Sequence, residues 1–139
     1  MDNVLIVVDD LEAVKAFFIE LGLVLEGEAT VEGPVVGKLI GLEDVNATLA
    51  MLRTPDGQGI ELDKFHIPEA VRYGPVKAPV NTLGIRRVMF VVAEIDAVVA
   101  HMRDSGAELI GEMQYEDMYR LAYIRGPEGI IVGLSEPIR

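Results

Sequence analysis

The chain has no cysteine, and only two of its 139 residues are histidines. Without cysteine it can form no disulfide framework and can use no thiolate as a nucleophile or metal ligand. It also lacks an apolar run long enough to span a bilayer, and no basic, signal-like segment precedes its first predicted strand. We therefore expect a protein of the cytoplasm that is not inserted in a membrane.

Positive charge is scarce as well. The 12 lysine and arginine residues are outnumbered by 23 aspartate and glutamate residues, which gives a net charge of −11. A surface that binds nucleic acid needs a basic face, so this composition argues against a nucleic-acid partner. An acidic surface suits a cationic small ligand, and it equally serves solubility alone.

What the chain does contain is an internal repeat. Residues 7–14 recur as residues 91–98, with apolar and acidic positions in the same order except that Asp9 falls on Ala93, and Gly22 recurs as Gly106. The segment Arg-Thr-Pro-Asp-Gly at 53–57 returns as Arg-Gly-Pro-Glu-Gly at 125–129. Such a repeat indicates that one supersecondary module is used twice.

Each copy predicts a strand, a helix and three further strands. A short β-branched apolar run opens each copy, and apolar residues at helical spacing follow it. In the first copy Asp9 is the expected helix N-cap, Glu12 completes a capping box, and Gly22 ends the helix. The predicted strands are 4–8, 23–31, 46–53 and 59–65, then 87–92, 108–113, 119–125 and 130–135, with helices at 10–21 and 95–104 and an irregular flap or short helical turn at 33–41.

These predictions describe one α+β domain over residues 1–139, with modules at about 1–65 and 85–139. The linker at 66–84 contains Pro68, Pro75 and Pro79 and shows little periodicity. Half of the residues are hydrophobic, which is enough for a core. Each module alone is near the size at which one core becomes marginal, so we expect the two to fold together or across a dimer.

Three motifs relate the modules to known proteins. They are Val-Val-Asp-Asp-Leu-Glu-Ala at 7–13, the pairs Phe17-Phe18 and Leu21-Gly22 at the end of the first helix, and the Pro-Asp/Glu-Gly turns before the last strands. In these features the chain resembles the glyoxalase / bleomycin-resistance / extradiol-dioxygenase superfamily, also called the vicinal oxygen chelate fold. The resemblance covers nearly the whole chain. It implies two tandem βαβββ modules that form curved mixed sheets around a cleft.

Enzymes of that superfamily hold a divalent metal with side chains from the first and last strands of each module. The matching positions here are Asn3, Glu61, Arg87 and Gly133. Arg87 cannot ligate a metal and Gly133 has no side chain, so Glu61 is the one competent ligand. His66 starts the predicted linker and His101 lies inside the second helix, so neither is expected on the concave strand face. We therefore predict no metal and no cofactor.

The metal-free branch of the superfamily resembles the bleomycin-resistance proteins, which are homodimers that sequester a drug without chemistry. The resemblance therefore implies a small-molecule-binding protein, a drug or metabolite sequestration factor that confers resistance, and a homodimer. The alternative is a metal-dependent lyase, isomerase or dioxygenase of the same fold, with a displaced metal site or with Glu61 as the base. A third hypothesis is a ligand-gated interaction module, which the sequence does not distinguish from a small-molecule-binding protein.

Side chains of a strand alternate between its two faces, so the family's ligand positions define which neighbours face the cleft. The residues predicted to contact the ligand are Asn3, Leu5, Glu61, Asp63, Arg87, Met89, Tyr119, Tyr123 and Gly133. The two tyrosines offer flat surfaces for a planar ligand if they face inward, or are ordinary tyrosines of a sheet surface. Gly133 opens volume for a bulkier ligand, or marks a bulge.

Arg87 occupies one of the positions that a metal ligand would hold. A lone carboxylate in an apolar cleft is costly, so we predict that the Arg87 guanidinium reaches Glu61 and replaces the missing cation. The alternative is that Arg86 and Arg87 are both solvated charges at the entrance of a strand.

Overall fold

The computed structural model describes residues 1–138 and divides the chain into two compact units. Unit one is Met1–Tyr73 and unit two begins at Gly74, so the boundary falls inside the predicted linker. No helix among the described residues is long and apolar enough to cross a membrane.

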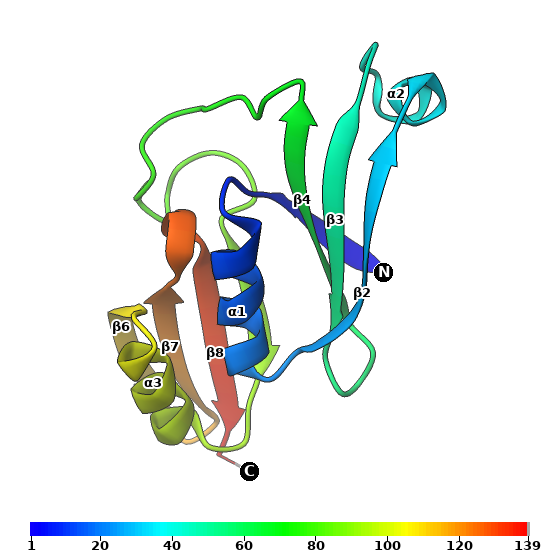
Figure 1. Cartoon of the computed structure of the whole chain (residues 1–139). Helices are drawn as coiled ribbons and strands as arrows, with labels where there is room; N and C mark the ends of the chain where they lie inside the picture. Colours follow the sequence, from blue (N-terminus) through cyan, green and yellow to red (C-terminus); the bar gives the residue numbers. More distant parts are fainter. Residues whose placement is uncertain (139) are drawn as a thin grey trace. The chain divides into compact units, whose positions relative to one another are not determined.

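Unit one is a four-stranded mixed sheet with a helix packed on one face (Figure 1). The sheet order is β1-β4-β3-β2, with β1 parallel to β4 and the other neighbours antiparallel. Its elements are β1 (Asn3–Val7), α1 (Leu11–Leu21), β2 (Val24–Glu32), α2 (Pro34–Ile40), β3 (Asn46–Arg53) and β4 (Gly59–Ile67).

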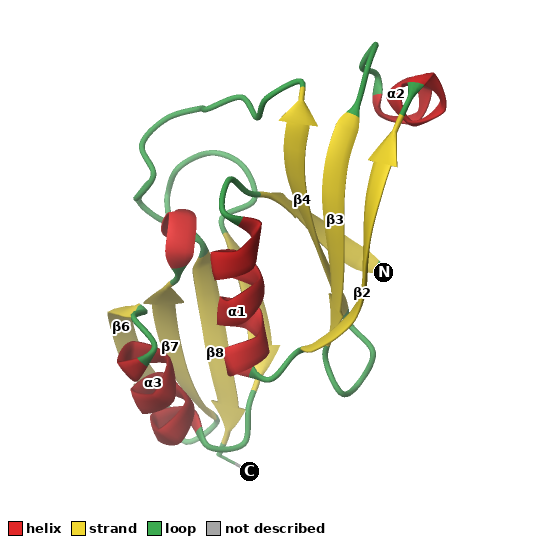
Figure 2. Ribbon diagram, viewed as in Figure 1, coloured by secondary structure: helices red, strands yellow, loops and turns green. Residues whose placement is uncertain are grey.

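Unit two repeats this topology with sheet order β5-β8-β7-β6, and α3 lies over one face of its sheet (Figure 2). Its elements are β5 (Arg87–Val91), α3 (Ile95–Asp104), β6 (Glu108–Tyr115), β7 (Tyr119–Arg125), the short 3-10 turn Pro127–Gly129 and β8 (Ile131–Pro137). The predicted fold class, a duplicated βαβββ module of the α+β type, is confirmed.

Each core lies between a helix and its own sheet. In unit one, Val14 and Phe18 of α1 are fully buried, as are Leu52 and Leu62 of the strands beneath them. In unit two the fully buried residues include Met102 of α3 with Ile124 and Leu134. Burying one such side chain contributes about 1.5–3 kcal/mol, so the apolar spacing read from the sequence is what holds each helix to its sheet.

The repeated Arg-x-Pro-Asp/Glu-Gly motif has a structural cause. Arg53 donates from Nη1 to the Gly57 carbonyl at 3.2 Å, and Arg125 donates from Nη1 to the Gly129 carbonyl at 3.1 Å. In both units the arginine that ends one strand therefore closes the hairpin turn that leads to the last strand. Both turn glycines have positive φ, at 93° and 79°, which favours glycine at that position.

Two local predictions were wrong. The N-cap of α1 is Asp10, whose carboxylate accepts from the Ala13 amide at 3.0 Å, whereas Asp9 forms an ion pair with Arg72. Strand β4 continues to Ile67, so His66 belongs to the sheet, where its Nε2 lies 2.9 Å from Thr48 Oγ1. Of the two alternatives predicted for 33–41, the structure has the helical one, because α2 is a short helix that begins with proline in its first turn.

The start of α3 is held differently from that of α1. Its N-cap residue, Glu94, makes no side-chain hydrogen bond to the helix. Instead the Ile95 amide donates to Glu136 of β8 at 3.4 Å, and Arg120 of β7 donates to Asp96 at 2.9 Å. The sheet of unit two thus supplies the partners that a capping side chain supplies in unit one.

The cap of α1 can be tested by replacing Asp10. Asp10→Ala removes the acceptor for the Ala13 amide, so we expect a loss of about 1 kcal/mol of unfolding free energy in urea titrations. Asp10→Asn keeps an acceptor at the same place and should lose only a few tenths of that amount. Equal losses in the two variants would contradict this assignment of the cap.

Candidate functional site

The candidate site of unit one lies on the sheet face opposite α1. Along β4, Ile60 and Leu62 point toward the helix and are buried, so Glu61 and Asp63 point to the other face. Strand β1 pairs in parallel with β4 and places Leu5 beside Glu61 and Val7 beside Asp63. We call this side, with Asn3, Leu5, Val7, Glu61 and Asp63, the helix-free face of unit one.

Asp63 is the unusual side chain of this face. It is only 6% exposed, and its Oδ1 is buried without a hydrogen-bond partner among the described residues. Burial, followed by a hydrogen bond to Glu61 and the repulsion between the two carboxylates, raises the pKa of Asp63 from 3.8 to about 7. Asp63 therefore keeps its proton up to about pH 7.

The strands on either side of this carboxylate pair contribute apolar side chains. Strand β3 places Met51 beside Glu61 and Leu49 beside Asp63, and β1 places Leu5 and Val7 there. None of these neighbours can neutralise a carboxylate, which is why the second charge of the pair is so unfavourable.

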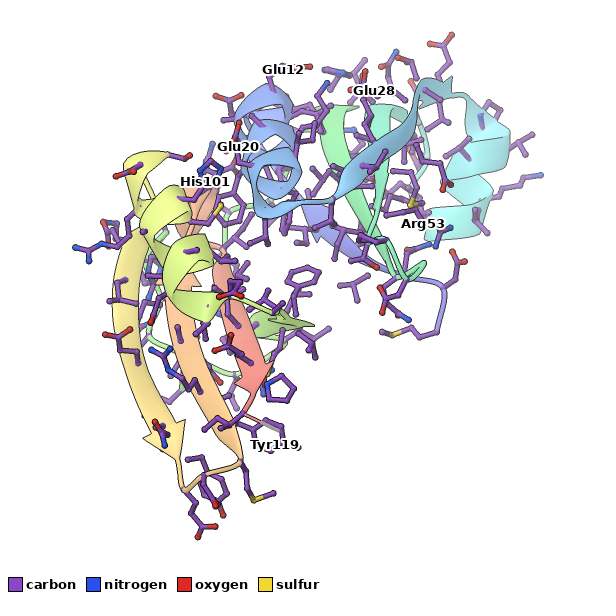
Figure 3. The ribbon with its side chains drawn as sticks, turned by 90° about the horizontal axis from the view of Figure 1, so that it is seen from below. Glu12, Glu20, Glu28, Arg53, His101 and Tyr119 are labelled. Atoms are coloured by element: carbon purple, nitrogen blue, oxygen red, sulfur yellow. The ribbon has the colours of Figure 1, made fainter. Side chains whose placement is uncertain are left out.

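The arginine at the end of β3 was not predicted as part of this face. Arg53 Nη1 would lie 2.9 Å from a Cβ built on Gly59, so its guanidinium covers the start of β4 (Figure 3). Its charge is shared with two other acids, since it pairs with Glu26 at 3.1 Å and with Asp2 at 3.4 Å. Asn3 donates to the same Asp2 carboxylate at 2.7 Å. Only the repeat of Arg53 as Arg125 hinted at this role in the sequence.

In unit two the predicted residues Arg87, Met89, Tyr123 and Gly133 come together on the face opposite α3. The Arg87 guanidinium carbon lies 5.6 Å from the centre of the Tyr123 ring, a cation–π contact. Gly133 pairs in regular register with Met89 on one side and with Tyr123 on the other. The predicted ion pair of Arg87 with Glu61, which belongs to unit one, stays a prediction.

The bulge predicted as one alternative at Gly133 was wrong, because the strand register there is regular. A Cβ built on Gly133 would lie 2.7 Å from Met89 Cε and 3.4 Å from Arg87 Cδ, so these two side chains occupy the space beside it. Met89 Cε is the free end of a flexible side chain, and the volume expected there for a ligand stays a prediction.

Tyr119 and Tyr123 alternate with buried Ala122 and Ile124 along β7, so both stand on the face opposite α3. Tyr119 also lines a shallow hollow of about 320 Å³ together with Asp117, Met118 and Pro137. Their role in holding a planar ligand stays a prediction.

The two units differ at one position that decides their chemistry. Asp63 and Ser135 are the buried polar side chains among the described residues, and the repeat aligns them. Their main-chain carbonyls accept equivalent hydrogen bonds: Asp63 accepts from the Val8 amide at 2.9 Å, and Ser135 accepts from the Val92 amide at 2.8 Å. Because serine does not titrate, only unit one has an ionisable group at this depth.

The residues at the four positions that correspond to the superfamily's metal ligands are not suited to binding a divalent metal. Gly133 supplies no donor and its side-chain space is occupied, while Arg87 presents a cation and Asn3 is bonded to Asp2. Within residues 1–138, no group of three or more histidine, aspartate or glutamate side chains is placed to hold a metal ion. The two histidines lie elsewhere, His66 beside Thr48 and His101 in the last turn of α3.

A hollow of about 560 Å³ in unit one lies on the helix side of the sheet, near the start of α1. Asp9, Thr48, Lys64 and His66 are among its lining residues. It mixes acidic and basic groups at the surface.

Comparison with known proteins agrees with the fold and the repeat. The sequence profile of the Glyoxalase/Bleomycin resistance protein/Dioxygenase superfamily matches residues 2–123, and the chain belongs to this superfamily. A search of curated proteins gives no significant match.

Several solved structures share the fold. A glyoxalase family protein from Bacillus cereus is 50% identical, with a TM-score of 0.94 over 100% of this chain and 94% of that one. An antibiotic-binding protein from a Streptomyces species is 19% identical, with a TM-score of 0.58 over 99% and 94% of the two chains. The trypanothione-dependent glyoxalase I of Leishmania major is also 19% identical, with a TM-score of 0.65 over 98% and 85%. The last two likenesses concern the fold alone.

The raised pKa of Asp63 predicts a particular pH dependence of stability. In the unfolded chain Asp63 is ionised above about pH 4, but in the folded protein it keeps its proton up to about pH 7. Folding therefore takes up a proton in this window, and stability falls as the pH rises through it. Asp63→Ser introduces the residue found in unit two and removes this loss. The free energy of unfolding of the variant, relative to that of wild type, should therefore increase between pH 5 and pH 8, by at most about 3 kcal/mol.

Urea titrations of both proteins at pH 5 and pH 8 measure this difference. The matched control is Asp44→Ser, which makes the same chemical change in an exposed loop and should show no such gain. If Asp63→Ser and Asp44→Ser respond to pH alike, Asp63 does not carry the predicted proton.

Proposed function

We propose that the protein binds and sequesters a small molecule without a metal and without catalysis. The observation that carries this proposal is the chemistry of the four positions at which superfamily enzymes are expected to hold their metal. Of Asn3, Glu61, Arg87 and Gly133, only Glu61 offers a charged oxygen ligand, and Arg87 adds a cation that would repel a metal.

The comparisons support the binding part of the proposal by analogy. One structural relative is described as an antibiotic-binding protein, so the fold is compatible with binding. In this chain the residues proposed to contact the ligand are Asn3, Leu5, Glu61 and Asp63 of unit one, and Arg87, Met89, Tyr119, Tyr123 and Gly133 of unit two. Gly133 contributes main chain only, because Met89 and Arg87 fill the space beside it.

A homodimer in the cytoplasm completes the proposal. Two copies of a duplicated chain can give a two-fold assembly with two equivalent sites. The acidic composition and the lack of cysteine suit such a protein. Light scattering at micromolar concentration should give the mass of two chains, and a single-chain mass would contradict the dimer.

Metal content and ligand response test the main proposal. Protein purified without added metal and dialysed should contain much less than one equivalent of any transition metal by elemental analysis. A thermal-shift screen of metabolites and antibiotics should find compounds that raise the melting temperature, because binding to the folded state stabilises it by mass action. A stoichiometric metal that survives dialysis would contradict the proposal, whatever the screen finds.

An enzyme of the same fold is the second candidate, and one observation favours it. Asp63 has a pKa of about 7, which is the range in which a carboxyl group serves as a general acid or base at neutral pH. This candidate base, Asp63, differs from the predicted one, which was Glu61. Turnover of a screened ligand that is lost in both Glu61→Gln and Asp63→Ser, while binding remains, would favour the enzyme over sequestration.

A further inference from the structure

The arginine that closes the hairpin turn has different charged neighbours in the two units. In unit one, Arg53 forms ion pairs with Asp2 at 3.4 Å and with Glu26 at 3.1 Å. In unit two, Arg125 donates to two main-chain carbonyls, at 3.1 Å each. A carbonyl satisfies a donor but carries no net charge, so the positive charge of Arg125 is not neutralised as that of Arg53 is.

The two acids that pair with the arginine of unit one have no counterparts in unit two. The residue before β1 is Asp2, and the residue before β5 is Arg86. Strands β2 and β6 carry a bulge at the same place, where the residues are Glu26 and Ile110. One aligned position has thus lost its negative charge, and the other has a positive charge instead.

Arg87, the first residue of β5, brings a third guanidinium to this end of the sheet. Arg87 and Arg125 are the register partners of Ile131 on its two sides, and these side chains stand on the face opposite α3. Since neighbouring strands lie about 4.8 Å apart, the two arginines start about 10 Å from each other. The Arg87 guanidinium carbon lies 5.6 Å from the ring centre of Tyr123, so the side chain leans towards the strand that carries Arg125.

Arg86 does not point freely into solvent. It is half-buried, and its Nε is buried without an acceptor among residues 1–138. A Cβ built on Gly84 would lie 3.1 Å from Arg86 Nη2, so the guanidinium folds back over the chain that leads into β5. A guanidinium that is partly withdrawn from water and lacks an acceptor is unfavourable, so its charge adds to the need for an anion here.

The acids described in unit two, within residues 74–138, form no ion pair with these three arginines. The acid beside Arg125 on β6 is Glu108, which is paired with Lys77. The hydrogen bond and the charge of Lys77, and then the charge of Arg125, hold the pKa of Glu108 below its ordinary value. Glu108 thus balances Lys77, and the arginines keep a surplus of positive charge.

The ligand group that fits this surplus is a phosphate or phosphonate. Guanidinium groups bind phosphate through two parallel N–H···O bonds. A phosphate monoester carries a charge of about −1.5 to −2 and three acceptor oxygens, so it can serve more than one guanidinium at once. Beyond the arginines, Val91 and Tyr119 of the same face remain 75% and 40% exposed, so surface for an organic group adjoins the charge.

We propose that Arg86, Arg87 and Arg125 bind the phosphate or phosphonate group of a small organic ligand on the sheet face of unit two opposite α3. This inference rests on the proposed ligand-binding function and names the charged group of the ligand. The net charge of −11 does not oppose it, because exposed charges are screened beyond about 8–10 Å at physiological salt. Unit one has no equivalent site, since Asp2 and Glu26 already neutralise Arg53.

The probe is phenyl phosphate, and its neutral counterpart is benzyl alcohol. Amide chemical shifts of the ¹⁵N-labelled full chain are followed at pH 7.5 and constant ionic strength, where the phosphate is a dianion. We expect saturable shifts centred on the starts of β5 and β8 and the end of β7 with phenyl phosphate, and much weaker binding of benzyl alcohol. Inorganic phosphate should shift the same amides with lower affinity, because it lacks the organic group.

Two variants remove the proposed charges. Arg86→Asp introduces the acid that unit one has at this position, so it should pair with Arg125 and weaken phenyl phosphate binding by about tenfold or more. Its stability in urea titrations should match or exceed that of wild type, which separates lost binding from unfolding. Arg87→Gln keeps the length of the side chain nearly unchanged and should weaken binding by about tenfold.

The matched control is Arg103→Gln, which removes an arginine from the exposed last turn of α3. It makes the same chemical change as Arg87→Gln but on the helix side of unit two. Binding of phenyl phosphate to this variant should stay within about twofold of wild type, because only screened, long-range charge is lost.

Three results would overturn the inference. They are benzyl alcohol binding as tight as that of phenyl phosphate, phenyl phosphate binding that Arg86→Asp leaves unchanged, and an equal loss of binding in Arg87→Gln and Arg103→Gln. If any of them occurs while other compounds from the ligand screen still stabilise the protein, ligand binding stands and only the phosphate assignment fails. If the screen also finds no ligand, the proposed function fails with it.

Discussion

The parallel pairing of the first and last strands of each module is the constraint on which the rest of the structure depends. Parallel neighbours cannot be joined by a tight turn, so the chain must cross over one face of the sheet, and it does so with α1 and α3. In each unit the helix packs against every second side chain of the last strand, β4 or β8, and buries it in the core. The alternate side chains, Glu61 and Asp63 among them, are left on the other face, and the candidate site follows from this division.

The two units share this fold but differ in the charge that the last strand carries. At aligned positions unit one has Glu61 and Asp63, whereas unit two has Gly133 and Ser135. In unit two the space beside the glycine is filled by Met89 and Arg87, and the guanidinium lies against an aromatic ring. Unit one therefore carries two carboxyl groups at this place, of which Asp63 is buried, and unit two carries the Arg87 guanidinium against the Tyr123 ring.

Much of the fold could be predicted from the sequence, because the repeat fixed the order of elements and the apolar spacing fixed the buried faces. The helix cap was misplaced by one residue, since Asp9 and Asp10 are chemically alike and only the path of the chain separates them. The space beside Gly133, expected to be open, is occupied by Met89 and Arg87 in this structure. Whether a missing side chain leaves a hole depends on the rotamers of its neighbours, and a sequence does not contain these.

The sequence was enough to predict which residues share the face of the candidate site, but not the raised pKa of Asp63. Strand alternation was enough to place Leu5, Glu61 and Asp63 on one face. The proton on Asp63 depends on burial and on the distance to Glu61, and both arise from packing. A carboxylate in a strand looks the same in the sequence whether it is solvated or buried, so the raised pKa of Asp63 had no distinguishing signal there.

The arginine that closes each hairpin turn also bears on the order in which the chain folds. Arg53 and Gly57 are four positions apart, so their hydrogen bond and the antiparallel pairing of β3 with β4 need only a short loop to close. The pairing of β1 with β4 joins the two ends of the module. Closing this long loop costs chain entropy, and the contacts between the two strands offset that cost only after the loop has closed. We expect the hairpins to form early and each first strand to be added last, which makes completion of the helix-free face, with its acidic pair, a late event in folding.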